Sequence, residues 1–214
     1  MKLNIFVRTN IFFIFGVYVF NYIETENIVI LGFWNTNIFY PDWVKKYLFP
    51  DKEINMQFLL NNSNTHRILV DNFILLISPN KLSLSSKIQS EAAYYKIQEI
   101  ALKISDYLPH TPVNGFGINY YLEIEKTKVN IDKNTLPLID KFDKKIDKYN
   151  LSYFFQYDKH DLTLRFSEKN DTMTIDANFN FLIKNFFDMK GALAENDILF
   201  YKKDLEAKLS NLLI

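Results

Sequence analysis

The sequence predicts an α+β protein in which a mostly antiparallel sheet carries two long helices packed on one face. Alternating apolar and polar residues from 162 to 181 predict a β-hairpin with one buried and one hydrated face. Two other segments, 90–108 and 196–213, repeat apolar residues at helical spacing. Strands that follow one another and are then followed by a helix are typical of the α+β class.

The elements of the first half follow from local signals. Pro41 is placed to begin a short helix and Pro50 to end it. Asp71 and Asn72 both tolerate a left-handed backbone, which suits the turn of a hairpin. Ser90 can cap the first long helix. The expected elements are a strand at 27–34, the short helix from Pro41, strands at 54–60, 66–70, 73–78 and 82–85, and a helix over 90–108.

The second half repeats this order of elements. Pro109 ends the first long helix, and a strand over 114–125 follows. The lysine- and aspartate-rich segment 133–150 indicates a short solvated helix or a loop. Three strands and the helix over 196–213 complete the half. Because the halves, 27–108 and 112–213, share an element order, the sequence suggests a duplicated unit inside one domain over 23–214.

The apolar N-terminal segment, residues 1–22, is the part whose role the sequence leaves most open. Lys2 and Arg8 precede an apolar run over 11–20, which is the charge order of a secretory signal. No small-residue cleavage site follows, and the run is shorter than the ~20 residues of a membrane span. We therefore expect an extension or first strand and a cytoplasmic protein. The alternative is a secreted or membrane-anchored protein that contacts the membrane through residues 1–20.

Composition argues against several classes of function. Acidic and basic residues number 25 each, and only three are arginines, so strong nucleic-acid binding is not expected. The chain has no cysteine, and no phosphate-binding glycine loop or serine nucleophile motif occurs. The three histidines lack the spacing of metal ligands, so we expect no metal and no cofactor. These histidines are His66, His110 and His160.

Catalytic candidates are few. His110 follows a helix, Glu123 lies on a strand, and Asp161 ends the Asp-Lys-His-Asp run at 158–161. The run lies between two strands, which favours a turn, and Glu123 shares its strand face with Glu125, which favours a solvated face. An enzyme would need these groups to meet at one pocket.

Gly115 and Gly117 fall on the same face of one expected strand, so something must approach that strand closely. We expect a helix packed tightly on the sheet, and a bound ligand is the alternative.

A resemblance to known proteins rests on two stretches of the sequence. The first, within 27–44, is Asn-Ile-Val-Ile-Leu-Gly followed by Pro-Asp-Trp. The second, within 108–125, is Leu-Pro-His-Thr-Pro-Val followed by Gly-Ile-Asn. The pair resembles an uncharacterised family of bacterial proteins, over about a sixth of the chain. The resemblance implies no activity and no catalytic residues. It implies that residues before about Tyr22 extend the common domain.

The sequence thus favours a non-enzymatic protein-interaction or self-associating module. The expected partners are further copies of the chain or another protein. A hydrolase with a site assembled from His110, Glu123 or Asp161 is the alternative.

Overall fold

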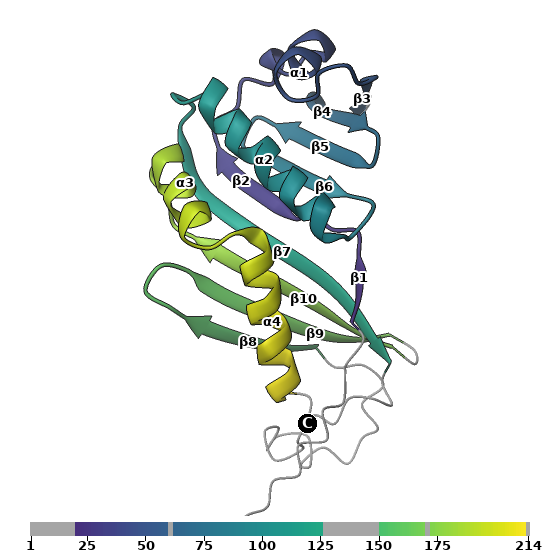
Figure 1. The fold of residues 1–214 in the computed structure, drawn as a ribbon, viewed down its shortest axis with the longest axis vertical. Coiled ribbons are helices and arrows are strands. Elements are labelled where there is room, and N and C mark those ends of the chain that lie inside the picture. Colours follow the sequence, from purple (N-terminus) through teal and green to yellow (C-terminus); the bar gives the residue numbers. More distant parts are fainter. Residues whose placement is uncertain (1–19, 60–61, 126–149, 170–171, 213–214) are drawn as a thin grey trace, which may run out of the picture.

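The computed structural model describes residues 20–59, 62–125, 150–169 and 172–212. The protein is α+β, and ten strands of these ranges form one antiparallel sheet (Figure 1). The strand order is β3-β4-β5-β6-β2-β7-β10-β9-β8, with β1 also beside β7. The strands are β1 (Asn21–Ile23), β2 (Ile28–Gly32), β3 (Asn55–Leu59), β4 (Asn62–Val70), β5 (Phe73–Ser78), β6 (Lys81–Ser86), β7 (Val113–Glu125), β8 (Asn150–Gln156), β9 (Asp161–Lys169) and β10 (Thr172–Phe181).

Strand β7 is the central element of the sheet. It is 13 residues long, and it pairs with β2 and β1 on one side and with β10 on the other. Its side chains alternate as the sequence predicts: Phe116, Ile118 and Tyr120 are buried on one face. The same alternation in β9 and β10 buries their apolar side chains next to those of β7, so one continuous core forms along the sheet.

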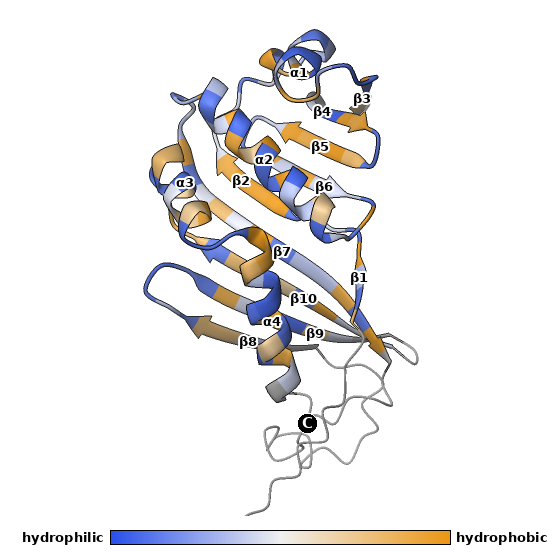
Figure 2. Ribbon diagram, in the orientation of Figure 1, coloured by the Kyte–Doolittle hydropathy of each residue, from blue (hydrophilic) through white to orange (hydrophobic). Residues whose placement is uncertain are grey.

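The helices of the described ranges are α1 (Pro41–Tyr47), α2 (Glu91–Tyr107), α3 (Phe186–Glu195) and α4 (Ile198–Leu212), and Thr36–Ile38 form the 3₁₀ turn η1. Helices α2, α3 and α4 lie on one face of the sheet, and Figure 2 shows apolar residues on the sheet beneath them. The Ser90 hydroxyl caps α2 by accepting from the Ala93 N–H. Tyr94 of α2 packs edge-to-face against Tyr120 of β7, with ring centroids 5.8 Å apart.

Helix α3 was not anticipated from the sequence, and strand β1 lies at the end of the 1–22 segment, for which an extension or a first strand was expected. Helix α3 forms because the Asn185 side chain accepts from the Asp188 N–H, and Asp188 in turn accepts from the Lys184 N–H. Three helices therefore cover this face of the sheet, where the sequence predicted two. Strand β1 has only three residues, too few for a visible alternation, and it brings residues 21–22 into the sheet.

Of the solvated helix or loop expected at 133–150, residues 133–149 lie outside the described residues, and Asn150 begins β8. The apolar run before residue 20 also lies outside them. Among the helices that the structure describes, none is long and apolar enough to cross a membrane.

Candidate functional site

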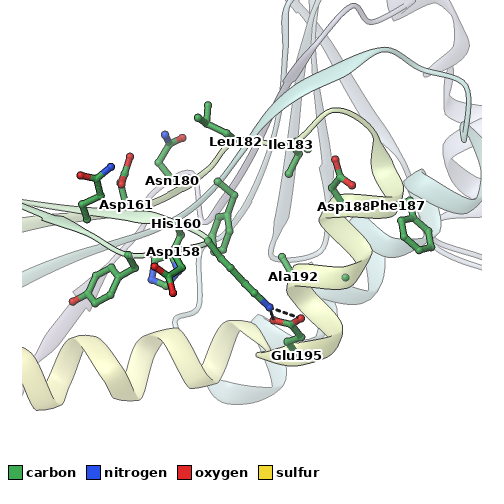
Figure 3. Close-up of a pocket in the computed structure, with 15 residues that line it drawn as sticks. Asp158, His160, Asp161, Asn180, Leu182, Ile183, Phe187, Asp188, Ala192 and Glu195 are labelled. Atoms are coloured by element: carbon green, nitrogen blue, oxygen red, sulfur yellow. Dashed lines mark hydrogen bonds and ion pairs between the residues drawn. The ribbon is translucent and has the colours of Figure 1, made fainter.

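A cavity of about 530 Å³ lies where the tip of the β8–β9 hairpin meets the end of β10 and helix α3 (Figure 3). We call it the hairpin cavity. Three segments of the second half form its wall, and the sheet brings the 156–161 turn against the other two. Its lining residues are Gln156 to Asp161, Asn180 to Ile183, Phe187, Asp188, Gly191, Ala192 and Glu195.

The hairpin tip is a tight turn. The Tyr157 N–H donates to the His160 carbonyl at 3.0 Å, and Gln156 pairs with Asp161 as the first rung of the ladder. Asp158 and Lys159 therefore occupy the turn itself, as the sequence predicts for the Asp-Lys-His-Asp run. From the turn, the Lys159 ammonium reaches the opposite wall, α3, where it pairs with the Glu195 carboxylate at 2.6 Å.

His160 is the histidine of the hairpin cavity, and its ring is half-buried among aromatic side chains. The imidazole stacks on Tyr157 with ring centroids 4.8 Å apart and an interplanar angle of 21°. It also contacts Phe181 at 5.2 Å and Tyr201 at 5.5 Å. Burial lowers the pKa of His160, and the nearby Asp204 carboxylate opposes that effect. The ring is therefore mainly neutral at pH 7 and acts as one more aromatic packing group.

The rim of the cavity is acidic. Asp158, Asp161, Asp188 and Glu195 line it together with a single ammonium, that of Lys159. The described residues contain no group of three or more acidic, histidine or cysteine side chains able to hold a metal ion. The rim therefore acts as a negative surface.

The rim also exposes large apolar side chains. Leu182 is 86% exposed and Phe187 is 82% exposed, the highest values among the large apolar residues that the structure describes. Figure 3 shows Leu182 pointing away from α3, and Phe187 on the outer side of that helix. Tyr157, 37% exposed, adds a third apolar surface at the hairpin tip.

The structure does not bring the three catalytic candidates of the sequence together. Asp161 lies in the hairpin cavity, whereas exposed His110 lines a separate cavity of about 370 Å³ with Tyr107. Asp161 pairs with Asn180 of β10, which in turn pairs with Gly117 of β7. Gly117 is six residues from Glu123 along β7. At ~3.3 Å per residue, Glu123 is therefore about 20 Å away along the strand. His110 precedes the start of β7 and Glu123 lies near its end, so no single substrate can reach both.

Gly115 and Gly117 meet side chains of neighbouring strands. A Cβ atom added at Gly115 would lie 3.2 Å from Leu31 Cδ1, and one at Gly117 would lie 3.3 Å from Asn178 Nδ2. The expectation of a helix over these glycines does not hold, because the helices cover the opposite face, which buries Phe116. Asn178 instead bonds to Asn119, whose amide donates to the Glu26 carbonyl at 2.8 Å.

Most of the hairpin cavity was not predicted from the sequence. The run at 158–161 was predicted as a turn, but no role was expected for Leu182 or for the residues of α3, Phe187 among them. The available signal was the pair Asn185 and Asp188, whose spacing is that of a helix N-terminus, with the two adjacent phenylalanines Phe186 and Phe187 between them.

No protein-family model matches the sequence, and no curated protein matches it. The resemblance to an uncharacterised bacterial family therefore stays a prediction.

Proposed function

We propose that this protein is a non-enzymatic protein-interaction module that binds a segment of a partner protein at the hairpin cavity. The observation that carries the proposal is the exposure of Leu182 and Phe187 on the rim of one cavity. Single exposed apolar residues are common on protein surfaces. Two of the most exposed ones beside a concave surface are typical of binding sites, where apolar side chains anchor a partner.

The charges of the rim define the chemistry of the partner. Four carboxylates and one ammonium line the cavity, and the ammonium of Lys159 is already paired with Glu195. Complementary charge steers partners and selects among them. The segment that fits this surface has apolar side chains for Leu182 and Phe187 and lysine or arginine side chains for Asp158 and Asp161.

Among the described residues, the catalytic candidates of the sequence do not converge, and this supports the non-enzymatic part of the proposal. His110, Glu123 and Asp161 lie apart, and the imidazole of His160 packs between rings. A general acid or base must reach the reacting atom within hydrogen-bonding distance. The hairpin cavity offers packing and charge to a ligand, which are the properties of a binding surface.

We infer that the two halves of the chain are copies of one unit. In the first half, the last strand, β6, pairs with the first, β2, and helix α2 follows in the sequence. In the second half β10 returns beside β7, and α3 and α4 follow. Strands β2 and β7, the first of each half, are antiparallel neighbours at the middle of the sheet, which is the relation expected about a two-fold axis. The extra helix α3, which forms the wall of the hairpin cavity, belongs to the second copy alone.

Selection of peptides from a random phage-displayed library tests the proposed function. We expect wild-type protein to enrich peptides that combine aromatic or aliphatic residues with lysine and arginine. The double variant Leu182→Ser/Phe187→Ser should lose these peptides, with a fall in affinity of at least about tenfold, because truncating two anchor residues typically costs more than 1 kcal/mol each. The fold should be unaffected, because both side chains are almost fully exposed.

Tyr95→Ser is the matched control, since Tyr95 is an exposed aromatic residue of α2 outside the cavity. It should retain the selected peptides. Enrichment of acidic peptides, or peptides that bind the double variant as well as wild type, would contradict the proposal.

A further inference from the structure

We propose that two copies of this chain associate through strand β8, which pairs antiparallel with β8 of a second copy and joins the two sheets into one. The proposal concerns the sheet edge and does not rest on peptide binding at the hairpin cavity.

Strand β8 ends the strand order of the sheet, and β9 is its only partner among the described strands (Figure 1). The Tyr157 N–H donates to the His160 carbonyl, so these two residues form a hydrogen-bonded pair. Hydrogen-bonded and non-hydrogen-bonded pairs then alternate along the hairpin. This alternation places Phe155 and Tyr153 in hydrogen-bonded pairs with β9. The N–H and C=O groups of Ser152, Phe154 and Gln156 therefore face outward, where a further strand would bind them.

The β8 edge lacks the features that normally prevent such pairing. Its sequence, Asn-Leu-Ser-Tyr-Phe-Phe-Gln, contains no charge and no proline, and its register with β9 is regular over all seven residues. The opposite edge, β3, has only five residues and its register shifts between Phe58 and Leu59. Irregular and short edges resist pairing, so β8 is the edge open to a strand.

The side chains of β8 are complementary to their own copy. Antiparallel pairing centred on Phe154 places Phe154 opposite Phe154 of the second copy. Phe154 is 65% exposed, so this contact would cover an apolar surface now in water. On the other face, Tyr153 would lie opposite Phe155 of the second copy. These two rings are half-buried, and their centroids already lie 6.4 Å apart within one chain.

A second copy fits this edge better than another protein strand does, because no charge needs a complementary charge and every aromatic residue meets an aromatic residue. The pairing is isologous, so it closes as a dimer and leaves the irregular β3 edges at the outer ends.

Light scattering of the full chain after size exclusion tests the proposal. Wild type should elute with twice the 25.4 kDa mass of one chain. Ser152→Pro removes one outward N–H without touching the bonds to β9, and Phe154→Lys places like charges opposite each other; both should give monomers. Phe58→Lys, a control at the exposed phenylalanine of the other edge, should remain dimeric. A mixture of Phe154→Lys and Phe154→Glu should restore the dimer.

Amide exchange of wild type provides a test without mutation. The amides of Ser152, Phe154 and Gln156 should exchange at least about tenfold more slowly at concentrations that favour the dimer than at those that favour the monomer. A wild-type monomer at high micromolar concentration would overturn the proposal, whether another segment of the chain covers the edge or none does. A dimer that survives Ser152→Pro and Phe154→Lys, or one that Phe58→Lys dissociates, would overturn it equally.

Discussion

Replacing Gly32 by alanine should destabilise the protein through one specific contact. Gly32 ends β2, where the register with β7 shifts. A Cβ atom at this position would lie 2.3 Å from the Pro112 carbonyl oxygen, whereas ordinary van der Waals contact begins at 3.4 Å. That oxygen is held in place because it accepts the Phe33 N–H at 2.9 Å. The two strands must therefore move apart by about 1 Å, and overpacking of this kind typically costs about 1–3 kcal/mol.

Gly191 provides the matched control for the same substitution. It lies inside α3, and a Cβ atom added there would meet nothing within 4 Å. Since glycine in a helix interior is about 0.8–1.0 kcal/mol less favourable than alanine, Gly191→Ala should stabilise the protein. Identical chemistry at the two positions should therefore change the free energy of unfolding in opposite directions.

Urea unfolding followed by circular dichroism measures both variants. With a urea m-value of about 2–3 kcal/mol/M, the midpoint of Gly32→Ala should fall by about 0.5–1 M and that of Gly191→Ala should rise by a few tenths of a molar. If Gly32→Ala leaves the midpoint unchanged or raises it, the close approach of β2 to the Pro112 carbonyl is refuted.

Two further predictions concern His160 and Asn27. NMR titration should give His160 a pKa below 6.5, because the folded protein favours the neutral ring; the unfolded chain then binds the proton more readily, so stability should fall as pH drops below 6.5. His160→Phe should lose this part of the pH dependence, and a pKa above 6.5 would contradict the packing described for the ring. Asn27→Ala should cost about 1–3 kcal/mol, because the fully buried Asn27 side chain accepts the Ser86 N–H at 3.1 Å and that donor would be left unpaired. Thermal unfolding checks this change, and an unaltered melting temperature would argue against the bond.

The antiparallel sheet was predictable because its strands carry the signal in their own residues. Alternation along β9 and β10 identified both strands and their buried faces, and Ser90 identified the start of α2. Asp71 takes a left-handed backbone, with φ of 50°, at the turn between β4 and β5, as the hairpin dipeptide indicated. Each of these features depends on short-range sequence alone.

Other features depend on contacts between distant segments, which one sequence does not encode locally. The side chain that lies over Gly115 comes from Leu31, and the register of β2 on β7 decides that contact. The hairpin cavity likewise arises because α3 packs back against the 157–160 turn. The sequence therefore identified the Asp-Lys-His-Asp run as a turn, but it did not predict α3, the helix that makes this turn part of the hairpin cavity.

The central claim is that the hairpin cavity binds a basic, apolar protein segment. The most direct measurement is an ¹H–¹⁵N NMR titration of the full chain with a selected peptide. We expect shift changes at residues 156–161 and 180–195, with little change on the outer face around Asn119 and Asn178. Changes centred on that face, or none at the cavity under saturating peptide, would contradict the claim.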